Sequence, residues 1–270
     1  MRMKLPFCFV AFIALFIVID AKAQLTKVAE LPIANVTKAS VDRLGNFYFI
    51  FPEGKMQKYD PDGQLLNETN ESILPLTLIE PWNPLRIFLY SLDKGEISFL
   101  DHHLTEIENQ ILEPSLSITP ILVCPANEVN KAWILDEADY TIKRVDLVNN
   151  TIEWESRLDI DPYVDPDFVF MREYQNRLFL LSKKKGIMVL NNLGKPITTI
   201  DAQGLEFFNF VGEELCYRKN DEIILVDLFT GTSRSVAQLQ DLGQIVLTIL
   251  TDERLVVINK SNIVFYQHDL

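Results

Sequence analysis

The sequence has 270 residues, 48% of them hydrophobic, and a formal net charge of −13. This acidic balance argues against nucleic acid and anionic membrane surfaces as partners, because a phosphate-bearing partner requires a basic binding surface. Three cysteines are too few for a disulfide scaffold, so the protein must depend on a hydrophobic core, which a chain of this length can build.

The first 23 residues have the pattern of a secretory signal peptide. Arg2 and Lys4 precede an apolar run over residues 5–19, and Ala21 and Ala23 supply the small side chains of a cleavage site. The run is shorter than the roughly 20 residues that a membrane-spanning helix needs. We expect cleavage after Ala23 and a secreted or periplasmic protein with no membrane span in the mature chain. An uncleaved membrane anchor is the alternative.

The mature chain should be a single domain over residues 24–270. Residues 1–23 contain three basic residues and one acidic residue, so their removal changes the formal charge from −13 to −15. Cys124 and Cys216 lie inside apolar, strand-like runs. We expect two buried, unpaired thiols, because free cysteine packs as a small hydrophobic residue.

One apolar strand core recurs six times along the mature chain, with first residues 37 to 46 positions apart. The six cores are 47–50, 87–90, 132–135, 178–181, 215–217 and 255–258. A polar turn and a second apolar strand follow each core. Five of the six second strands end in an acid or amide, namely Asp60, Asp101, Asp146, Asn191 and Asp227, and the sixth ends in Gln267.

Each unit also has a β-rich run before the core and a weaker strand after the turn. Four short strands in a unit of about 40 residues are typical of a β-propeller blade. Several cores are apolar on both faces, as expected of strands that lie between neighbouring blades. The sequence therefore predicts an all-β, six-bladed β-propeller.

The ends of the chain predict how the ring closes. The last unit has only three strands, whereas residues 25–32 form a spare strand ahead of the first unit. We expect this N-terminal strand to join the last blade as its outermost strand, so that no blade edge is left open.

The first unit resembles the repeat of the NHL and TolB-like six-bladed propellers. Residues 42–48 read Asp-Arg-Leu-Gly-Asn-Phe-Tyr and residues 58–63 read Lys-Tyr-Asp-Pro-Asp-Gly. The other units keep the spacing but lose the Gly-Asn pair. The resemblance implies the fold, but that superfamily contains scaffolds, hydrolases and sensor domains, so it implies no single function.

Two groups of carboxylates are candidates for a metal site. Residues 159–167 contain four Asp, which could bind calcium, although Lys183, Lys184 and Lys185 should lie on the same face and balance that charge. Asp42, Glu80 and Glu173 lie near the ends of three innermost strands, as channel ligands would in the related lactonases. Neither pattern is specific enough to name ligands, and we expect no cofactor.

No residue can be named as catalytic. His102, His103 and His268 are the only histidines; the first two follow Asp101 in a turn, where solvation is expected. The sequence contains no Gly-x-Ser-x-Gly elbow.

The loop Glu80-Pro81-Trp82-Asn83-Pro84 is the strongest binding feature. Its two prolines could present Trp82 to a partner; alternatively, Trp82 packs over the second blade. Trp133 and Trp154 fall within strands and are predicted to lie in the core.

These observations lead to an exported, non-catalytic scaffold that binds an envelope or extracellular protein or a glycan. The alternative is a metal-dependent hydrolase of the lactonase type, with its site in the central channel. A third possibility is the sensor part of a larger envelope assembly.

Overall fold

The computed structural model describes residues 24–270, except residues 74, 162, 164, 165 and 241. The described residues form 24 strands and contain no helix. The expected signal peptide, residues 1–23, lies outside the described residues, so its cleavage and the export of the protein stay predictions.

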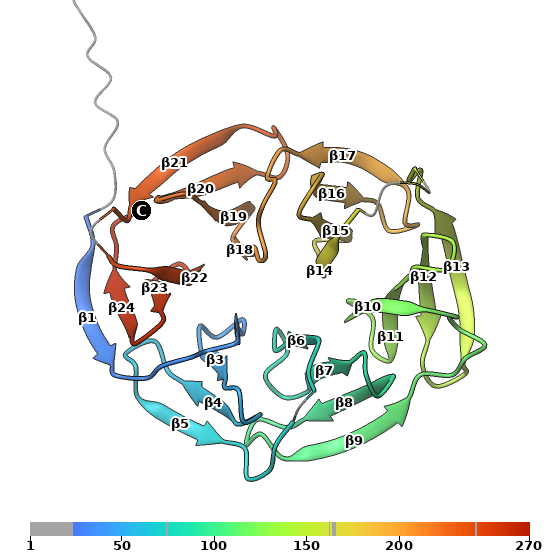
Figure 1. The fold of residues 1–270 in the computed structure, drawn as a ribbon, viewed down its shortest axis with the longest axis horizontal. Coiled ribbons are helices and arrows are strands. Elements are labelled where there is room, and N and C mark those ends of the chain that lie inside the picture. Colours follow the sequence, from blue (N-terminus) through green and yellow to red (C-terminus); the bar gives the residue numbers. More distant parts are fainter. Residues whose placement is uncertain (1–23, 74, 162, 164–165, 241) are drawn as a thin grey trace, which may run out of the picture.

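The strands form six four-stranded antiparallel sheets, arranged as blades around a central axis (Figure 1). Blade one contains β2 (Lys38–Val41), β3 (Phe47–Ile50), β4 (Met56–Tyr59) and β5 (Leu65–Glu68). Blade two contains β6 (Leu78–Glu80), β7 (Ile87–Ser91), β8 (Glu96–Leu100) and β9 (Glu106–Ile111). Blade three contains β10 (Pro120–Pro125), β11 (Lys131–Asp136), β12 (Thr141–Asp146) and β13 (Thr151–Arg157). Blade four contains β14 (Phe168–Tyr174), β15 (Arg177–Ser182), β16 (Gly186–Leu190) and β17 (Pro196–Ile200). Blade five contains β18 (Asn209–Val211), β19 (Glu214–Lys219), β20 (Glu222–Asp227) and β21 (Ser233–Gln238). Blade six contains β22 (Ile245–Leu250), β23 (Arg254–Asn259), β24 (Ile263–Gln267) and β1 (Thr26–Leu31). The prediction of a six-bladed propeller is confirmed.

The ring closes as the ends of the chain predict. Strand β1 pairs antiparallel with β24, with Thr26 opposite Gln267 and Leu31 opposite Ile263. Ala29 and Leu31 pack against the apolar cluster between the last and first blades. The N-terminal strand therefore completes the sixth blade (Figure 1).

The hydrophobic core lies between neighbouring blades. All four residues of β3 are buried, because alternate side chains face the blade on either side. Phe47 meets Phe265 of the last blade edge to face, with ring centroids 5.5 Å apart, whereas Tyr48 and Ile50 belong to the cluster shared with blade two. Strands covered on both faces explain why the six cores are almost continuously apolar.

The acid or amide that ends each of five third strands holds the following turn. Oδ1 of Asp60 accepts hydrogen bonds from the backbone N–H groups of Asp62 and Gln64, at 3.0 and 2.8 Å. Asp101, Asn191, Asp146 and Asp227 accept equivalent bonds from the backbone of their own turns. These bonds lower the pKa of Asp101, Asp146 and Asp227. The repeated marker is therefore a turn-forming device, since Asp and Asn mimic a backbone turn.

The motif at residues 42–48 has a similar explanation. Oδ1 of Asp42 accepts hydrogen bonds from the N–H groups of Leu44 and Asn46, and Oδ2 accepts bonds from Asn46 Nδ2 and the hydroxyl of Tyr48. Gly45 has a φ of +81°, which only glycine adopts without strain. Burial raises the pKa of Tyr48, so its hydroxyl stays a donor to Asp42.

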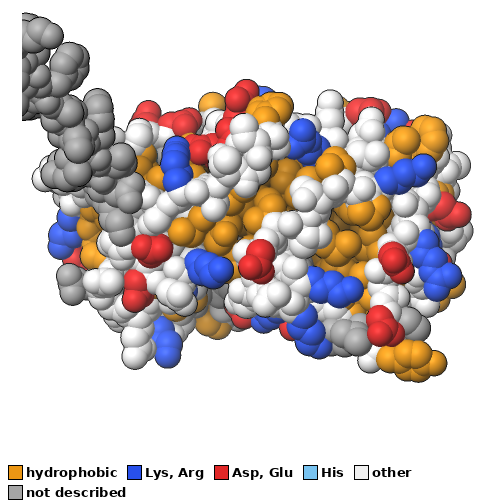
Figure 2. Space-filling model, turned by 90° about the horizontal axis from the view of Figure 1, so that it is seen from above, with side chains coloured by type: hydrophobic (Ala, Val, Ile, Leu, Met, Phe, Trp, Pro, Cys, Tyr) orange, Lys and Arg blue, Asp and Glu red, His pale blue; other side chains and the backbone are white. Residues whose placement is uncertain are grey.

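The two strand tryptophans, Trp133 and Trp154, differ in burial. Trp133 is buried in β11, as predicted, but Trp154 is 50% exposed in β13, so the prediction that it lies in the core is wrong. Strand β13 is the outermost strand of its blade, and all of its residues except Ser156 are exposed. The rim seen in Figure 2 likewise shows apolar side chains among charges of both signs.

Cys124 and Cys216 are free and buried, as expected. Within the described part of the chain, no helix has the length and apolar character needed to cross a membrane.

Candidate functional site

The two ends of the central channel carry different side chains. The innermost strands of all six blades run in the same direction, because each blade repeats the same strand order. Their first residues therefore meet at one face, which we call the funnel face. Their last residues meet at the other face, together with the loops that join the first and second strands; we call it the Trp82 face.

The three channel carboxylates do not converge on one point. Asp42 is occupied by its own turn. Glu173 accepts hydrogen bonds from Trp133 Nε1 at 2.6 Å and from the backbone of Asn127 at 3.1 Å. Across the described residues, no group of three or more His, Cys, Asp or Glu side chains is placed to hold a metal ion. The described residues therefore contain no set of metal ligands of the kind that the lactonase-type alternative requires.

Glu80 instead forms an ion pair that spans the channel near the Trp82 face. Arg172 of β14 donates from Nε to Glu80 Oε2 at 2.6 Å and from Nη2 to Oε1 at 2.7 Å. The two side chains are only 3% and 6% exposed. Glu80 Oε1 also accepts a bond from the backbone N–H of Trp82. Two blades that are not neighbours are therefore joined by a bidentate, buried bond.

Trp82 lies directly over this ion pair. The guanidinium of Arg172 is 5.6 Å from the ring centroid, and the ring of Tyr174 meets it edge to face at 5.8 Å. Tyr174 in turn stacks on Phe210 at 4.1 Å, and its hydroxyl donates to the carbonyl of Gly212. Trp82 thus packs against the fourth blade, which neither of the two sequence interpretations foresaw, and it is still 40% exposed.

Three exposed apolar side chains lie in the loop of Trp82 and in two loops next to it. Leu85 follows in the same loop and Leu44 lies in the adjacent turn, where the N–H of Arg43 reaches the carbonyl of Trp82. Val129, in the β10–β11 loop, lines with Trp82 a small cavity of about 160 Å³. Leu44, Leu85 and Val129 are 67, 63 and 78% exposed. We call these four residues the Trp82 surface.

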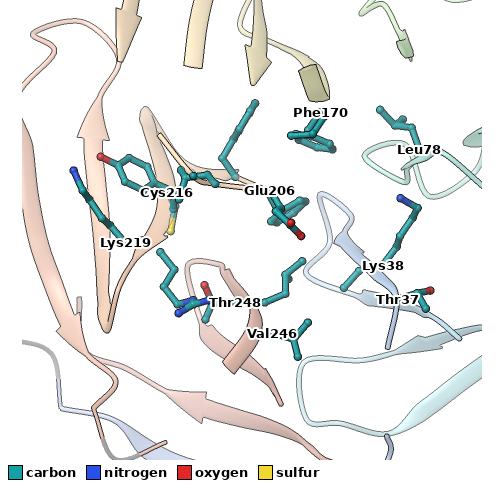
Figure 3. A pocket seen from close by; sticks show the side chains of 18 of the residues that line it. Thr37, Lys38, Leu78, Phe170, Glu206, Cys216, Lys219, Val246 and Thr248 are labelled. Atoms are coloured by element: carbon teal, nitrogen blue, oxygen red, sulfur yellow. The ribbon is translucent and has the colours of Figure 1, made fainter. Parts of the chain in front are cut away.

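The funnel face opens into a larger cavity of about 610 Å³ (Figure 3). Five blades line it, and blade three does not contribute. Lys38 and Leu78 lie on one side of the cavity, and Cys216 and Lys219 on the opposite side, with Phe170 between them. Burial lowers the pKa of Lys38, although Glu206 acts in the opposite direction.

The remaining sequence candidates form no second site in the described residues. The N–H of Lys183 donates to the carbonyl of Asp167, so the basic and acidic segments do lie side by side, but Lys183 pairs with Glu206. Asp165, which the calcium hypothesis needs, lies outside the described residues. His102 and His103 are exposed in the β8–β9 turn, as expected.

Sequence reasoning missed Arg172, Lys38, Arg218 and Lys219. A signal was present for the first two, because each is the single cation of its innermost strand. Arg218 and Lys219 end a strand, where cations are common; only the ring geometry shows that they face the funnel.

Solved β-propellers have a similar fold. The structure of BBS1N in complex with ARL6DN matches with a TM-score of 0.57 and 10% identity, over 92% of this chain and 97% of that chain. A catalytically inactive virginiamycin B lyase from Staphylococcus aureus, with quinupristin, matches with a TM-score of 0.54 and 13% identity, over 88% and 82% of the two chains.

At such low identity the likeness shows the fold alone. No protein-family model matches the sequence, so the resemblance to the NHL and TolB-like propellers is not confirmed at the family level. A search of curated proteins gave no match. The blade architecture and the structural neighbours together identify the chain as a six-bladed β-propeller.

Proposed function

We propose that this protein is an exported, non-catalytic β-propeller that binds a protein partner through the Trp82 surface. The observation that carries the proposal is a rigidly held, half-exposed tryptophan with exposed apolar side chains in its own loop and in two loops next to it. Large exposed aromatic residues are the commonest anchors of protein interfaces. Clustered exposed apolar side chains on a folded domain mark interaction sites.

The rigidity of Trp82 matters for affinity. Arg172 and Tyr174 fix the ring from below, and Glu80 fixes the backbone of the loop. A side chain already held in place loses little conformational entropy on binding, so more of the contact energy is available for affinity.

The structural neighbours are consistent with either role for the fold. BBS1N was solved in a complex with another protein, ARL6DN, whereas the lyase was solved with quinupristin. Since the fold supports both, the choice rests on the Trp82 surface itself.

A pair of tryptophan variants tests the proposal. Immobilised protein of residues 24–270 would be used to capture proteins from the native envelope extract, and each captured species would be purified and titrated. We expect Trp82→Ala to weaken binding of the true partner by about 2 kcal/mol or more, the usual size of an interface hot spot. Trp154→Ala is the matched control, because Trp154 is similarly exposed but lies on the outer strand of blade three. Equal binding by both variants would refute the proposal.

A glycan is the second candidate ligand. The cavity beside Trp82 is lined by Asn83, Asn127 and Asn130, whose amides suit sugar hydroxyls. A glycan array would separate the two cases: binding lost with Trp82→Ala but kept with Leu44→Ala would favour the glycan, because Leu44 does not line that cavity.

A further inference from the structure

We propose that the funnel binds a small amphipathic anion, with an apolar body in the cavity and a carboxylate or phosphate held by Lys38. This site lies on the opposite face from the Trp82 surface and does not depend on the function proposed above. The cavity of about 610 Å³ is within the range of small-molecule sites.

The charge of the funnel opposes that of the whole protein. The chain has a formal net charge of −13, yet three cations line this cavity. Among the described residues, none of the three forms an ion pair with a carboxylate. Arg218 donates only to neutral carbonyl groups, those of Asn220 and Ile245. In the part of the chain that the structure describes, the guanidinium of Arg218 therefore has no carboxylate partner.

The acidic groups near the funnel do not cancel this charge. Glu206 lines the cavity, but its carboxylate is paired with Lys183 at 2.7 Å. Asp201 acts on the nearby Tyr217 and does not line the cavity. Asp221 and Glu222 follow Lys219 at the β19–β20 turn but do not line the cavity. Among the charged side chains that do line it, three are cations and one is an anion, a balance that favours anions as ligands.

The walls of the funnel suit an apolar ligand body. Phe170, Phe207 and Leu78 line it together with Val246, which is 47% exposed. Lys38 is partly buried among these side chains at the start of β2, and this burial lowers its pKa. A ligand anion would provide the partner that Lys38 lacks, in surroundings where a charge-assisted hydrogen bond is strong.

The funnel residues do not suggest a reaction. Cys216 is the only thiol in the wall described, and it is 2% exposed; burial raises its pKa, so the nucleophilic thiolate is disfavoured. We therefore assign the funnel a binding role.

The test is calorimetric titration of residues 24–270 with decanoate, decyl phosphate, decanol and decyltrimethylammonium at submicellar concentrations and low salt. We expect both anions to bind, with the alcohol and the cation at least about tenfold weaker. Lys38→Met should weaken anion binding roughly ten- to a hundredfold, because the loss of one hydrogen bond to a charged group changes the affinity by about that factor. A preference for decanoate or for decyl phosphate supports the proposal and identifies the headgroup.

Three further variants make the test specific. Val246→Glu places a negative charge on an exposed wall position and should abolish anion binding without disturbing the core. Lys195→Met is the matched control, because Lys195 is exposed in the β16–β17 turn, on the opposite face. Trp82→Ala should also leave anion binding unchanged. The proposal is overturned if neither anion binds, if the cation binds as tightly, or if Lys38→Met and Val246→Glu bind like the wild type.

Discussion

The ion pair between Glu80 and Arg172 should hold the centre of the ring together, and breaking it from one side should be costly. Arg172→Met removes the cation but keeps most of the apolar stem of the side chain. It leaves the Glu80 carboxylate with its bond from the Trp82 backbone but without an opposite charge, at a site only 6% exposed.

The magnitude follows from the burial of the pair. Removing one partner of a buried ion pair costs about 3–5 kcal/mol, because the other charge stays desolvated. In a domain of this size each kcal/mol lowers the unfolding midpoint by about 2–4 °C, so Arg172→Met should lower it by about 6–20 °C. The double variant Glu80→Gln with Arg172→Met should lose less than the sum of the two single variants, because neither charge is then left buried alone.

The assay is unfolding of residues 24–270 by urea, which gives the free energies, and by heat, which gives the thermal midpoints, for the wild type, both single variants and the double variant. Lys55→Met is the control, because Lys55 pairs with Glu68 at 2.7 Å on the surface, where both side chains are about 40% exposed. That substitution should cost less than about 1 kcal/mol. If Arg172→Met also costs less than about 1 kcal/mol, or if the effects of the single variants simply add, the cross-channel pair does not hold the ring as argued.

Three other predictions concern the architecture. Deleting residues 24–31 should destabilise the protein by about 3 kcal/mol or more, since Ala29 and Leu31 lose their burial; unfolding at the wild-type midpoint would contradict closure by β1. In the folded protein of residues 24–270, Cys124 and Cys216 should resist Ellman's reagent, because both are buried and burial raises both pKa values; rapid labelling before denaturation would contradict this. Gly186→Ala should cost about 1–3 kcal/mol in backbone strain alone, and more from overlap with the carbonyl of Ile200. Gly95→Ala, where a Cβ meets nothing within 4 Å, should cost less in the same unfolding assay, and equal costs would contradict the clash.

The acids and the amide in the turns explain why the number of blades could be predicted from the sequence. Asp60, Asp101 and Asn191 act within their own turns, on N–H groups two and four residues away. Such local interactions recur in sequence wherever the same turn recurs. The repeat of turn and apolar core was therefore enough to predict six blades and the closing role of β1.

Trp154 shows where local pattern fails. It stands in a strand of alternating character, as core residues do, yet β13 forms the outer edge of its blade. A strand's own sequence does not say whether another blade covers it. That depends on the packing of the whole ring.

The amino-acid sequence by itself determined the propeller, the blade number and the mode of closure, because these follow from short-range hydrogen bonds and repeated apolar strands. Which side chains come together at the two candidate sites was decided only by the tertiary structure. Glu80 and Arg172 are 92 residues apart, and the funnel draws side chains from five blades. Only closure of the ring brings such residues together, since no local signal records which innermost side chains meet across the channel.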